Sequence, residues 1–348
     1  MSFYFNLLAF FWAFFVSVFA IPSIIRVAHT KMLLDEPNGR ALHLNSTPRL
    51  GGLAIFAGFI SSLTLFGQLN NGIREMLAGA ILIFFIGLKD DIAPVSVFKK
   101  IFVQILVAGI VMFSGDIRIS GFYGIMGIYD INAVYGYLMT FLCIIGITNA
   151  VNLIDGLDGL AGSVIILVSC FLGMGFFLWG GASEGIYSVA AFSLVGAVLG
   201  FLKFNIRNAA IFMGDTGSLV SGFIISVLAI RFLEMHPFEY SPMYVIAVLF
   251  IPIMDTLRVV VLRILNGKSP FLADKNHLHH RLIDLGLRQP QVLALILGIN
   301  LGAVGLVLSF KQLSNNGLLL ILAGYALFVI TIIELLYRRK SARISDLV

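Results

Sequence analysis

The sequence predicts an all-α polytopic membrane protein, and three observations lead to this prediction. The chain has 348 residues, of which 59% are hydrophobic and only 12% are charged, whereas a soluble domain carries about 25% charged residues. Its mean hydropathy is +1.00. Long apolar runs alternate with short polar connections along the whole chain. This composition excludes a soluble globular enzyme, a disordered chain and a disulfide scaffold.

The apolar runs predict the membrane spans in order. A span needs about 20 apolar residues, and eleven runs come close to this length. The third run is short, so ten spans are the alternative, and we expect one integral membrane domain over residues 1–348. The predicted spans lie roughly at 3–25, 50–67, 74–88, 99–115, 132–150, 160–180, 185–203, 217–233, 242–262, 291–309 and 316–337.

The basic residues predict the orientation of the chain. By count, 19 of the 23 Lys and Arg residues fall in one alternating set of connections, formed by 26–49, 89–100, 203–207, 258–288 and 338–343. The positive-inside rule assigns that set to the cytoplasm. The N-terminus is then outside and the C-terminus is cytoplasmic. This distribution also explains the net charge of +5, so no nucleic-acid partner is expected.

The opposite set of connections is short, apart from residues 116–131. That segment alternates apolar and polar residues and is rich in glycine, a pattern that predicts a small hairpin.

Carboxylates gather at the cytoplasmic ends of the predicted spans. Acidic groups at membrane depth are costly and usually functional. Their convergence on one face indicates a cation site, a polar substrate, or both. They are Asp35, Asp90, Asp91, Asp155, Asp158, Asp215, Asp255 and Asp274.

Asp90 and Asp91 follow Lys89 at the end of an apolar run. Adjacent carboxylates repel each other, which raises one pKa unless a cation neutralises them. One of the pair is a candidate proton acceptor and the other a candidate partner of a metal or an ammonium group. The alternative is a solvated helix end with Lys89 as counter-charge.

The segment NLIDGLDGLAG at 152–162 has a polar residue at every third position. On a helical turn, Asn152, Asp155 and Asp158 would lie on adjacent rows of one side. Asp158 as the N-cap of the next span is the alternative for that residue alone.

The segment FMGDTGS at 212–218 opens another span. A helix N-terminus that contains glycine offers free N–H groups to a phosphate, and oxygen donors such as Asp215 suit Mg²⁺. The alternative is that Asp215 or Ser218 caps the helix.

Asp255 and Arg258 stand three residues apart inside a span, where a simple ion pair is the alternative to a functional role. Three of the six histidines follow within four residues, at His277, His279 and His280. With Arg263, Lys275 and Arg281 nearby, a phosphate clamp is favoured over zinc and over an ordinary surface loop.

The first cytoplasmic connection carries Arg40, His43 and Arg49, which suit an anionic ligand or form an ordinary basic loop. Lys99, Lys100 and Gln104 begin the fourth span at headgroup level. They suit lipid phosphate generally or one particular lipid phosphate.

These motifs, in this order, resemble the polyprenyl-phosphate N-acetylhexosamine-1-phosphate transferase family. The Asp90–Asp91 pair, NLIDGLDGLAG, FMGDTGS and DKNHLHH (274–280) each look like a family signature, and the likeness covers nearly the whole chain. LNSTPRLGG (44–52) and HLHH resemble the WecA/TagO branch. The MraY branch, a phospho-MurNAc-pentapeptide transferase, is the alternative, although it would show a different entry and histidine motif.

The resemblance implies transfer of N-acetylhexosamine 1-phosphate, with GlcNAc 1-phosphate expected, from a UDP-sugar to undecaprenyl phosphate. The products would be undecaprenyl-diphospho-sugar and UMP, in the first membrane step of a cell-envelope polysaccharide. It implies a bacterial cytoplasmic membrane location and contact with membrane lipids, and it is compatible with a homodimer.

The resemblance also implies roles for individual residues. Mg²⁺, with Mn²⁺ as substitute, would bind Asn152 and Asp215. Asp90 and Asp91 would position or deprotonate the lipid phosphate beside Lys100. The remaining expected roles are a nucleotide-sugar pocket shaped by Asp155 and Asp158, and substrate contacts from Arg49, Arg263, His277, His279, His280 and Arg281.

Two other classes remain as alternatives. A cation-coupled transporter also carries intramembrane carboxylates and glycine-broken spans. Against it, the acidic residues lie at one face and no internal repeat is visible. A non-catalytic assembly scaffold would not need the motifs intact.

Overall fold

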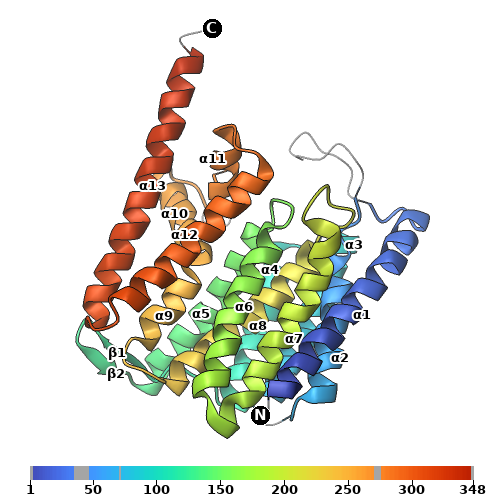
Figure 1. The fold of residues 1–348 in the computed structure, drawn as a ribbon, viewed down its shortest axis with the longest axis horizontal. Helices are drawn as coiled ribbons and strands as arrows, with labels where there is room; N and C mark the ends of the chain where they lie inside the picture. The colour runs from blue at the N-terminus through green and yellow to red at the C-terminus, as the bar shows by residue number, and fades with distance from the viewer. Residues whose placement is uncertain (1–2, 35–46, 70–71, 270–275, 346–348) are drawn as a thin grey trace. The chain divides into compact units, whose positions relative to one another are not determined.

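The computed structural model describes residues 3–34, 47–69, 72–269 and 276–345, most of which are helical (Figure 1). The elements in chain order are α1 (Phe3–Thr30), α2 (Gly51–Phe66), α3 (Ile73–Ile92), α4 (Val97–Gly109), η1 (Ile110–Ser114), β1 (Gly121–Ile125), β2 (Ile128–Asp130), α5 (Ala133–Ile154), α6 (Leu160–Trp179), α7 (Gly181–Asn205), α8 (Gly214–Met235), α9 (Ser241–Val248), α10 (Phe250–Leu265), α11 (Leu278–Asp284), α12 (Gln289–Ser309) and α13 (Asn315–Ser345).

Each of the eleven predicted runs falls on one helix or on two consecutive helical elements. Among the described residues, eight helices are long and apolar enough to cross a membrane, or nine if the bent pair α9–α10 counts as one span. The α2 helix, with 16 residues, is shorter, and α3 carries charged residues at both ends. The chain is therefore a multi-pass membrane protein, and the count of eleven spans stays a prediction.

The predicted hairpin within 116–131 is confirmed. Strands β1 and β2 pair into a two-stranded sheet. Gly124 and Gly127, at φ values of +86° and +75°, supply the left-handed conformations that a tight turn requires.

The helices divide into two compact units. The first unit contains α1 to α8. The second contains the hairpin tip, residues 122–129, and α9 to α13. In the first unit, α7 and α8 are the most buried helices, each with 89% of its apolar window inside the protein.

Small residues allow neighbouring backbones to approach the start of α8. Such residues favour helix association in membranes, because they let van der Waals contacts form between backbones. A Cβ on Gly52 would lie 2.2 Å from the Gly217 nitrogen, and a Cβ on Gly87 would lie 2.7 Å from the Thr216 Cα. Further along α8, a Cβ on Gly222 would meet the Thr148 carbonyl at 2.8 Å. Helices α2, α3 and α5 therefore converge on α8.

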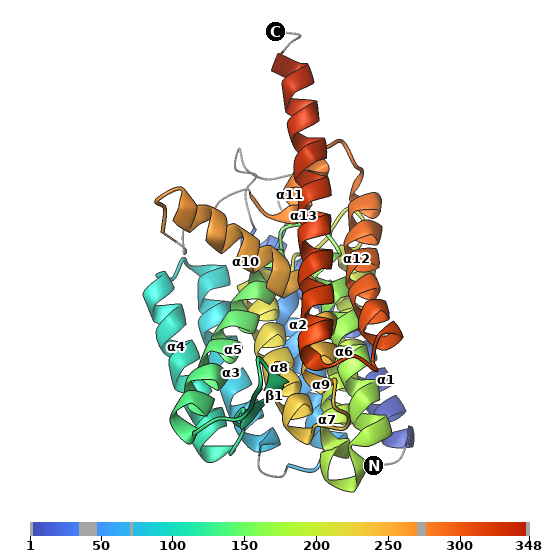
Figure 2. The ribbon, with the colours of Figure 1, turned by 90° about the vertical axis from the view of Figure 1, so that its left-hand side faces the viewer.

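The second unit contains a broken span. The sequence run at 242–262 forms two helices, α9 and α10, with axes bent by 73° at Leu249. Figure 2 shows α10 inclined relative to α12 and α13, which run side by side. Pro252 lies in the first turn of α10. Proline lacks an N–H group and is tolerated in the first turn of a helix, where such a group needs no intrahelical partner.

Candidate active site

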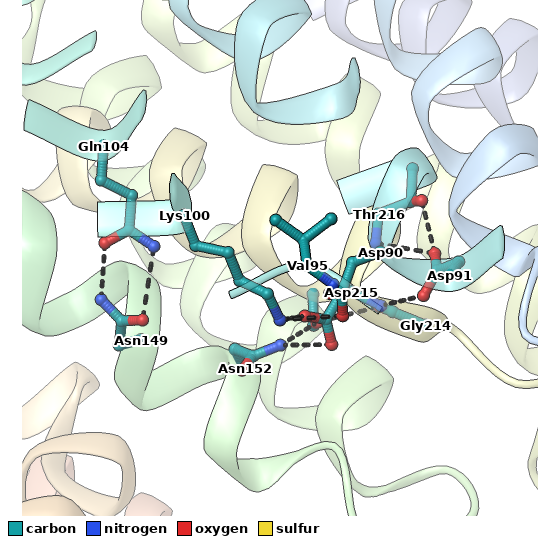
Figure 3. Close-up of polar contacts among 11 residues, drawn as sticks. Asp90, Asp91, Val95, Lys100, Gln104, Asn149, Asn152, Gly214, Asp215 and Thr216 are labelled. Atoms are coloured by element: carbon teal, nitrogen blue, oxygen red, sulfur yellow. Dashed lines mark hydrogen bonds and ion pairs between the residues drawn. The ribbon is translucent and has the colours of Figure 1, made fainter. Parts of the chain in front are cut away.

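Five polar side chains of the first unit meet around the start of α8 (Figure 3). The ammonium group of Lys100 on α4 donates to Asp90 Oδ2 at 2.8 Å and also to Asp215 Oδ2. Asn152, on the last turn of α5, donates to Asp215 Oδ1 at 3.2 Å and to Ser218 Oγ at 2.8 Å. The side chains of Lys100, Asp90 and Asp215 are 19–26% exposed. The cluster is therefore accessible from outside the protein.

The two adjacent carboxylates on α3 have different partners. Asp90 Oδ1 accepts the Val95 N–H at 2.6 Å, and its other oxygen faces Lys100. Asp91 instead accepts the N–H groups of Asp215 at 2.7 Å and Thr216 at 3.0 Å, and the Thr216 hydroxyl. Three donors thus hold Asp91 against α8.

The N-terminus of α8 is occupied by a side chain of the protein itself. The sequence predicted free N–H groups for a phosphate at this helix end, and that prediction is wrong for Asp215 and Thr216, because the Asp91 carboxylate accepts both N–H groups. A carboxylate is favoured at this position by the positive end of the helix dipole. The capping alternatives also fail, because Met213 is the N-cap and Ser218 Oγ donates to the Gly214 carbonyl.

The segment from Asn152 to Asp158 is not one helical face, so that prediction is wrong. Helix α5 ends at Ile154, Asp155 is its C-cap, and α6 begins at Leu160 after Gly159, which has φ of 78°. The capping alternative for Asp158 also fails, because Gly159 holds that position. The backbone already leaves the helical conformation at Asp155, where ψ is 55°, so Asp155 and Asp158 lie in the turn between α5 and α6.

That turn is tied to the segment before α8. Asp158 Oδ2 accepts the Ala209 N–H at 3.1 Å. The buried Asn205 accepts the Gly159 N–H at 2.8 Å and donates to the Ile211 carbonyl at 2.9 Å. The two segments singled out in the sequence, 152–162 and 212–218, are thereby linked through Asn205 and Asp158.

Asp155 lies among like charges. Burial, together with the charges of Asp215 and Asp91, raises the pKa of Asp155 to about 7, while Arg49 acts in the opposite direction and Asp158 adds to the rise. Removal from water and nearby anions both disfavour the ionised form of a carboxyl group. The surroundings of Asp155 therefore favour an added proton or an added cation.

A reciprocal amide pair lies one helical turn along from this cluster (Figure 3). Gln104 on α4 donates to Asn149 Oδ1 at 3.3 Å, and Asn149 on α5 donates to Gln104 Oε1 at 2.8 Å. Gln104 is only 2% exposed. The pair links the helices that carry Lys100 and Asn152, four and three residues away in sequence.

The second unit has a polar cluster of its own, centred on Asp255. Its Oδ1 accepts from Arg258 at 2.9 Å and from the Leu278 N–H at 3.0 Å, and its Oδ2 lies 2.9 Å from His277 Nδ1. Asp255 and Arg258 thus form an ion pair, and a functional role of the two residues stays a prediction. The same carboxylate also fixes the first residues of α11.

The other predicted residues of the second unit follow on α10 and α11. His279 is 2% exposed, and burial, then the neighbouring His280, lowers its pKa to about 3. It is therefore neutral at physiological pH. Arg281 donates to Asn276 Oδ1 at 3.1 Å and lies 4.0 Å from the Tyr337 ring centroid, while Arg263 is buried on α10.

Comparisons with known proteins identify the family. A model of glycosyl transferase family 4 matches residues 73–233. The "Probable undecaprenyl-phosphate N-acetylglucosaminyl 1-phosphate transferase" of Bacillus subtilis is 32% identical over 92% of this chain and 88% of its own length. The chain belongs to the polyprenyl-phosphate N-acetylhexosamine-1-phosphate transferase family.

Two further relatives carry names of the same kind. The "Decaprenyl-phosphate N-acetylglucosaminephosphotransferase" of Mycobacterium leprae is 31% identical over 94% of this chain and 89% of its own length. The "Undecaprenyl-phosphate alpha-N-acetylglucosaminyl 1-phosphate transferase" of Escherichia coli strain K12 is 27% identical over 87% and 84%. The Asp90, Asn152 and Asp215 cluster lies in the segment that the transferase family model matches.

The donor set at Asp215 and Asn152 suits a hard cation. Asp215 carries two carboxylate oxygens and Asn152 one amide oxygen, and such ligands suit Mg²⁺, which keeps few protein ligands. Within the described residues no group of three or more His, Cys, Asp or Glu is arranged to hold a metal ion. The fit of Mg²⁺ to this site therefore rests on two oxygen-donor residues. The remaining coordination positions of the ion are left to other oxygens.

Several residues that shape the transferase cluster were missed by sequence reasoning. Thr216, Asn149 and Asn205 make their contacts across 45 to 125 residues of sequence or across a loop, so no local pattern reveals them. Gln104 was noted only as a headgroup contact, although a glutamine inside an apolar run is itself a signal. The candidates Asp35, Arg40, His43, Asp274 and Lys275 lie outside the described residues.

Proposed function

We propose that this transferase moves N-acetylglucosamine 1-phosphate from UDP-N-acetylglucosamine to undecaprenyl phosphate in a bacterial cytoplasmic membrane, with Mg²⁺ as cofactor. One observation carries the proposal: Asp90 of α3 and Asp215 of α8 share the Lys100 ammonium group, and the charge of Asp215 also acts on Asp155 in the turn after α5. The names of the curated relatives support the lipid phosphate and the transferred sugar phosphate.

The charge of the cluster supports a bound cation. Asp90, Asp91, Asp155 and Asp215 supply four carboxylates, while Lys100 supplies one positive charge in contact with two of them. Arg49 acts on Asp155 from nearby. A surplus of negative charge in a partly desolvated site attracts divalent cations. A bound Mg²⁺ would neutralise charge on the diphosphate, and Asp215 and Asn152 would hold it.

The different partners of the two adjacent carboxylates suggest different roles. Asp91 is held by three donors at the start of α8, so we infer that it positions Asp215 and Thr216. Asp90 faces the Lys100 ammonium group and is the better candidate to accept a proton from the lipid phosphate. Lys100 would then hold the negative charge of the phosphate near the reacting phosphorus.

The reaction needs positioning more than covalent help from the protein. Phosphoryl transfer requires an in-line nucleophile and neutralised charge. In direct attack, the lipid phosphate oxygen forms a bond to the β-phosphorus of the UDP-sugar, and the bond from that phosphorus to the UMP oxygen breaks. One displacement inverts the configuration at phosphorus, so retention would contradict direct attack and favour an aspartyl-phosphate intermediate.

The test is an assay of the purified protein with undecaprenyl phosphate, Mg²⁺ and a panel of UDP-sugars, measuring UMP release. We expect UDP-N-acetylglucosamine to give the highest kcat/KM. Asp90→Asn, Asp91→Asn and Asp215→Asn should each lower the rate at least about 100-fold, while the proteins still insert in the membrane. Asp130→Asn, on the exposed strand β2, is the matched control.

Two outcomes of this assay would contradict the proposal. Full activity in all three site variants would refute the assigned cluster. Uptake of a solute into proteoliposomes without UMP formation would favour a cation-coupled transporter instead.

Changing His279 and His280 to Ala should raise the KM for the UDP-sugar while the protein still folds. Unchanged kinetics would count against a clamp by these histidines.

A further inference from the structure

A buried asparagine on α12 lies beside the break between α9 and α10. Asn300 has no exposed surface and lies near the middle of α12, one of the apolar helices. Its Oδ1 accepts the Ile251 N–H at 3.0 Å, and its Nδ2 donates to the Val248 carbonyl at 2.9 Å. A polar side chain at this depth is costly unless it is fully paired, and both ends of this amide are paired to the broken backbone.

These two bonds replace two bonds that a continuous helix would make. In an α-helix the N–H of residue 251 would donate to carbonyl 247, and carbonyl 248 would accept from residue 252. Residue 252 is proline and has no N–H. The Val248 carbonyl therefore has no intrahelical partner available, and Asn300 Nδ2 supplies one.

The break also fixes the direction of α10 and therefore the position of Asp255. Backbone groups inside a bilayer must be satisfied by the protein, so an irregular backbone needs a partner there. Asp255, one turn beyond Pro252, holds His277 and the Leu278 N–H. A change in the 73° bend would carry Asp255 away from the α11 segment.

We propose that Asn300 is a positioning residue that, together with Pro252, holds the bend between α9 and α10 and so holds Asp255 against His277. The part of this inference that concerns catalysis rests on the proposed function. The part that concerns the bend does not, because it is a statement about backbone hydrogen bonds in the second unit alone.

The bend is measured with two spin labels, in the full-length protein with Cys143 and Cys170 changed to Ser. One label replaces the exposed Glu239 before α9, and the other replaces Leu265, which is 77% exposed. Straightening helices of 8 and 16 residues from a bend of 73° would lengthen their end-to-end distance by about 6 Å at 1.5 Å rise per residue.

Three variants separate the contributions. Asn300→Leu should broaden the distance distribution toward longer values, because the Val248 carbonyl then has no donor. Asn300→Leu with Pro252→Ala should give one longer distance, and it keeps the test decisive if the single variant does not fold, because every backbone group can then find an intrahelical partner. Asn300→Asp should retain the short distance, because a buried carboxyl stays protonated and has one donor and one acceptor.

The matched control is Val307→Ala, which removes buried volume from the same helix without touching the break, and its distance should equal that of the wild type. A double variant that keeps the wild-type distance would overturn the role of Asn300 in the bend. In the transferase assay, the kcat/KM of the double variant should be about ten- to hundredfold lower than that of the wild type. Asn300→Asp should keep most of the wild-type kcat/KM.

The spin-label distances and the kcat/KM values test different parts of the inference. A straightened double variant with unchanged kcat/KM would overturn the link from the bend to Asp255. An inactive wild-type protein whose label distances still follow the variants would refute the proposed function and leave the role of Asn300 in the bend supported.

Discussion

At the scale of single residues, Lys100 is the centre of the candidate site, and its position depends on a short helix. The lipid-facing side of α4 is exposed, with Phe98 at 86% and Phe102 at 67%. The polar residue that α4 buries is Gln104, which pairs with Asn149. The amide pair is therefore a polar restraint on the helix that carries the ammonium group, in addition to the ion pairs of Lys100 itself.

We expect Gln104→Leu to lower kcat/KM about tenfold and Asn149→Leu to do the same, because either change removes the restraint on Lys100. Paired polar groups between membrane helices are worth about 0.6–2 kcal/mol. The double variant should therefore cost little more than either single variant in a double-mutant cycle. Ile105→Ala, at the exposed neighbour of Gln104 on α4, is the control. Fully additive effects would show that the two amides act independently.

Asp155 gives a prediction that depends on pH. Its pKa in the folded protein is about 7, raised from 3.8. The folded state therefore binds a proton more tightly than the unfolded state, and stability falls as the pH rises through the interval between these values. Asp155→Asn should thus raise the midpoint of thermal unfolding by about 2–4 °C at pH 8, in EDTA, which corresponds to about 1 kcal/mol.

The same substitution should have no effect on thermal stability at pH 4, where the carboxyl group is protonated in the folded protein. The measurement is thermal unfolding of the detergent-solubilised protein at several pH values between 4 and 8. An equal stabilisation at every pH would contradict an origin in ionisation.

At the scale of elements, backbone contact between α2 and α8 positions Asp215. A Cβ at Gly52 would lie 2.2 Å from the Gly217 nitrogen, a separation that no rotamer change can relieve because both groups are backbone. Gly52→Ala should therefore displace the start of α8 and cost about 1–3 kcal/mol of stability. Activity should fall at least tenfold, measured as UMP release.

The control for this change is Gly146→Ala on α5. A Cβ there would meet nothing within 4 Å, and alanine has the higher helix propensity, so stability and activity should be retained. Equal behaviour of the two variants would show that close approach at Gly52 is not what positions Asp215.

The elements also show what sequence reasoning can and cannot predict. The apolar runs and the hairpin followed from composition and alternation, because burial in a bilayer and turn chemistry act locally. The bend at Leu249 could not be predicted in this way, although Pro252 is visible in the run. A proline near the bilayer centre is compatible with a straight span unless another residue supplies hydrogen bonds to the broken backbone. The partner, Asn300, is 48 residues further along the chain.

The candidate site likewise had residues that the sequence could predict and contacts that it could not. Asp90, Asp91, Asn152 and Asp215 were identified from family-like motifs, and the structure brings all four together. The helical spacing assigned to Asp155 and Asp158 was wrong because α5 ends at Ile154 and the backbone of Asp155, with ψ of 55°, is not helical. The partners of Asp91 could not be predicted, since which N–H groups a carboxylate meets depends on how α3 packs against α8.

At the scale of the whole molecule, the distribution of charge predicts which side of the membrane each connection faces. Of 23 Lys and Arg residues, 19 lie in one alternating set of connections, and Asp90, Asp91 and Lys100 of the candidate site lie in this set. The nucleotide-sugar is a cytoplasmic metabolite class and the lipid phosphate a membrane one, so a site at this edge would meet both substrates.

Cysteine labelling tests this orientation. In a chain with Cys143 and Cys170 changed to Ser, single cysteines replace the exposed Arg207, in the basic set, and Met126, which is 79% exposed on the hairpin. A membrane-impermeant maleimide added to intact spheroplasts should label Met126→Cys and leave Arg207→Cys unlabelled, and permeabilised cells should label both. The reverse pattern would place the carboxylate cluster on the side that lacks UDP-sugars, and the transferase proposal would then fail at its first requirement, that both anionic substrates reach Lys100 from the same side of the membrane.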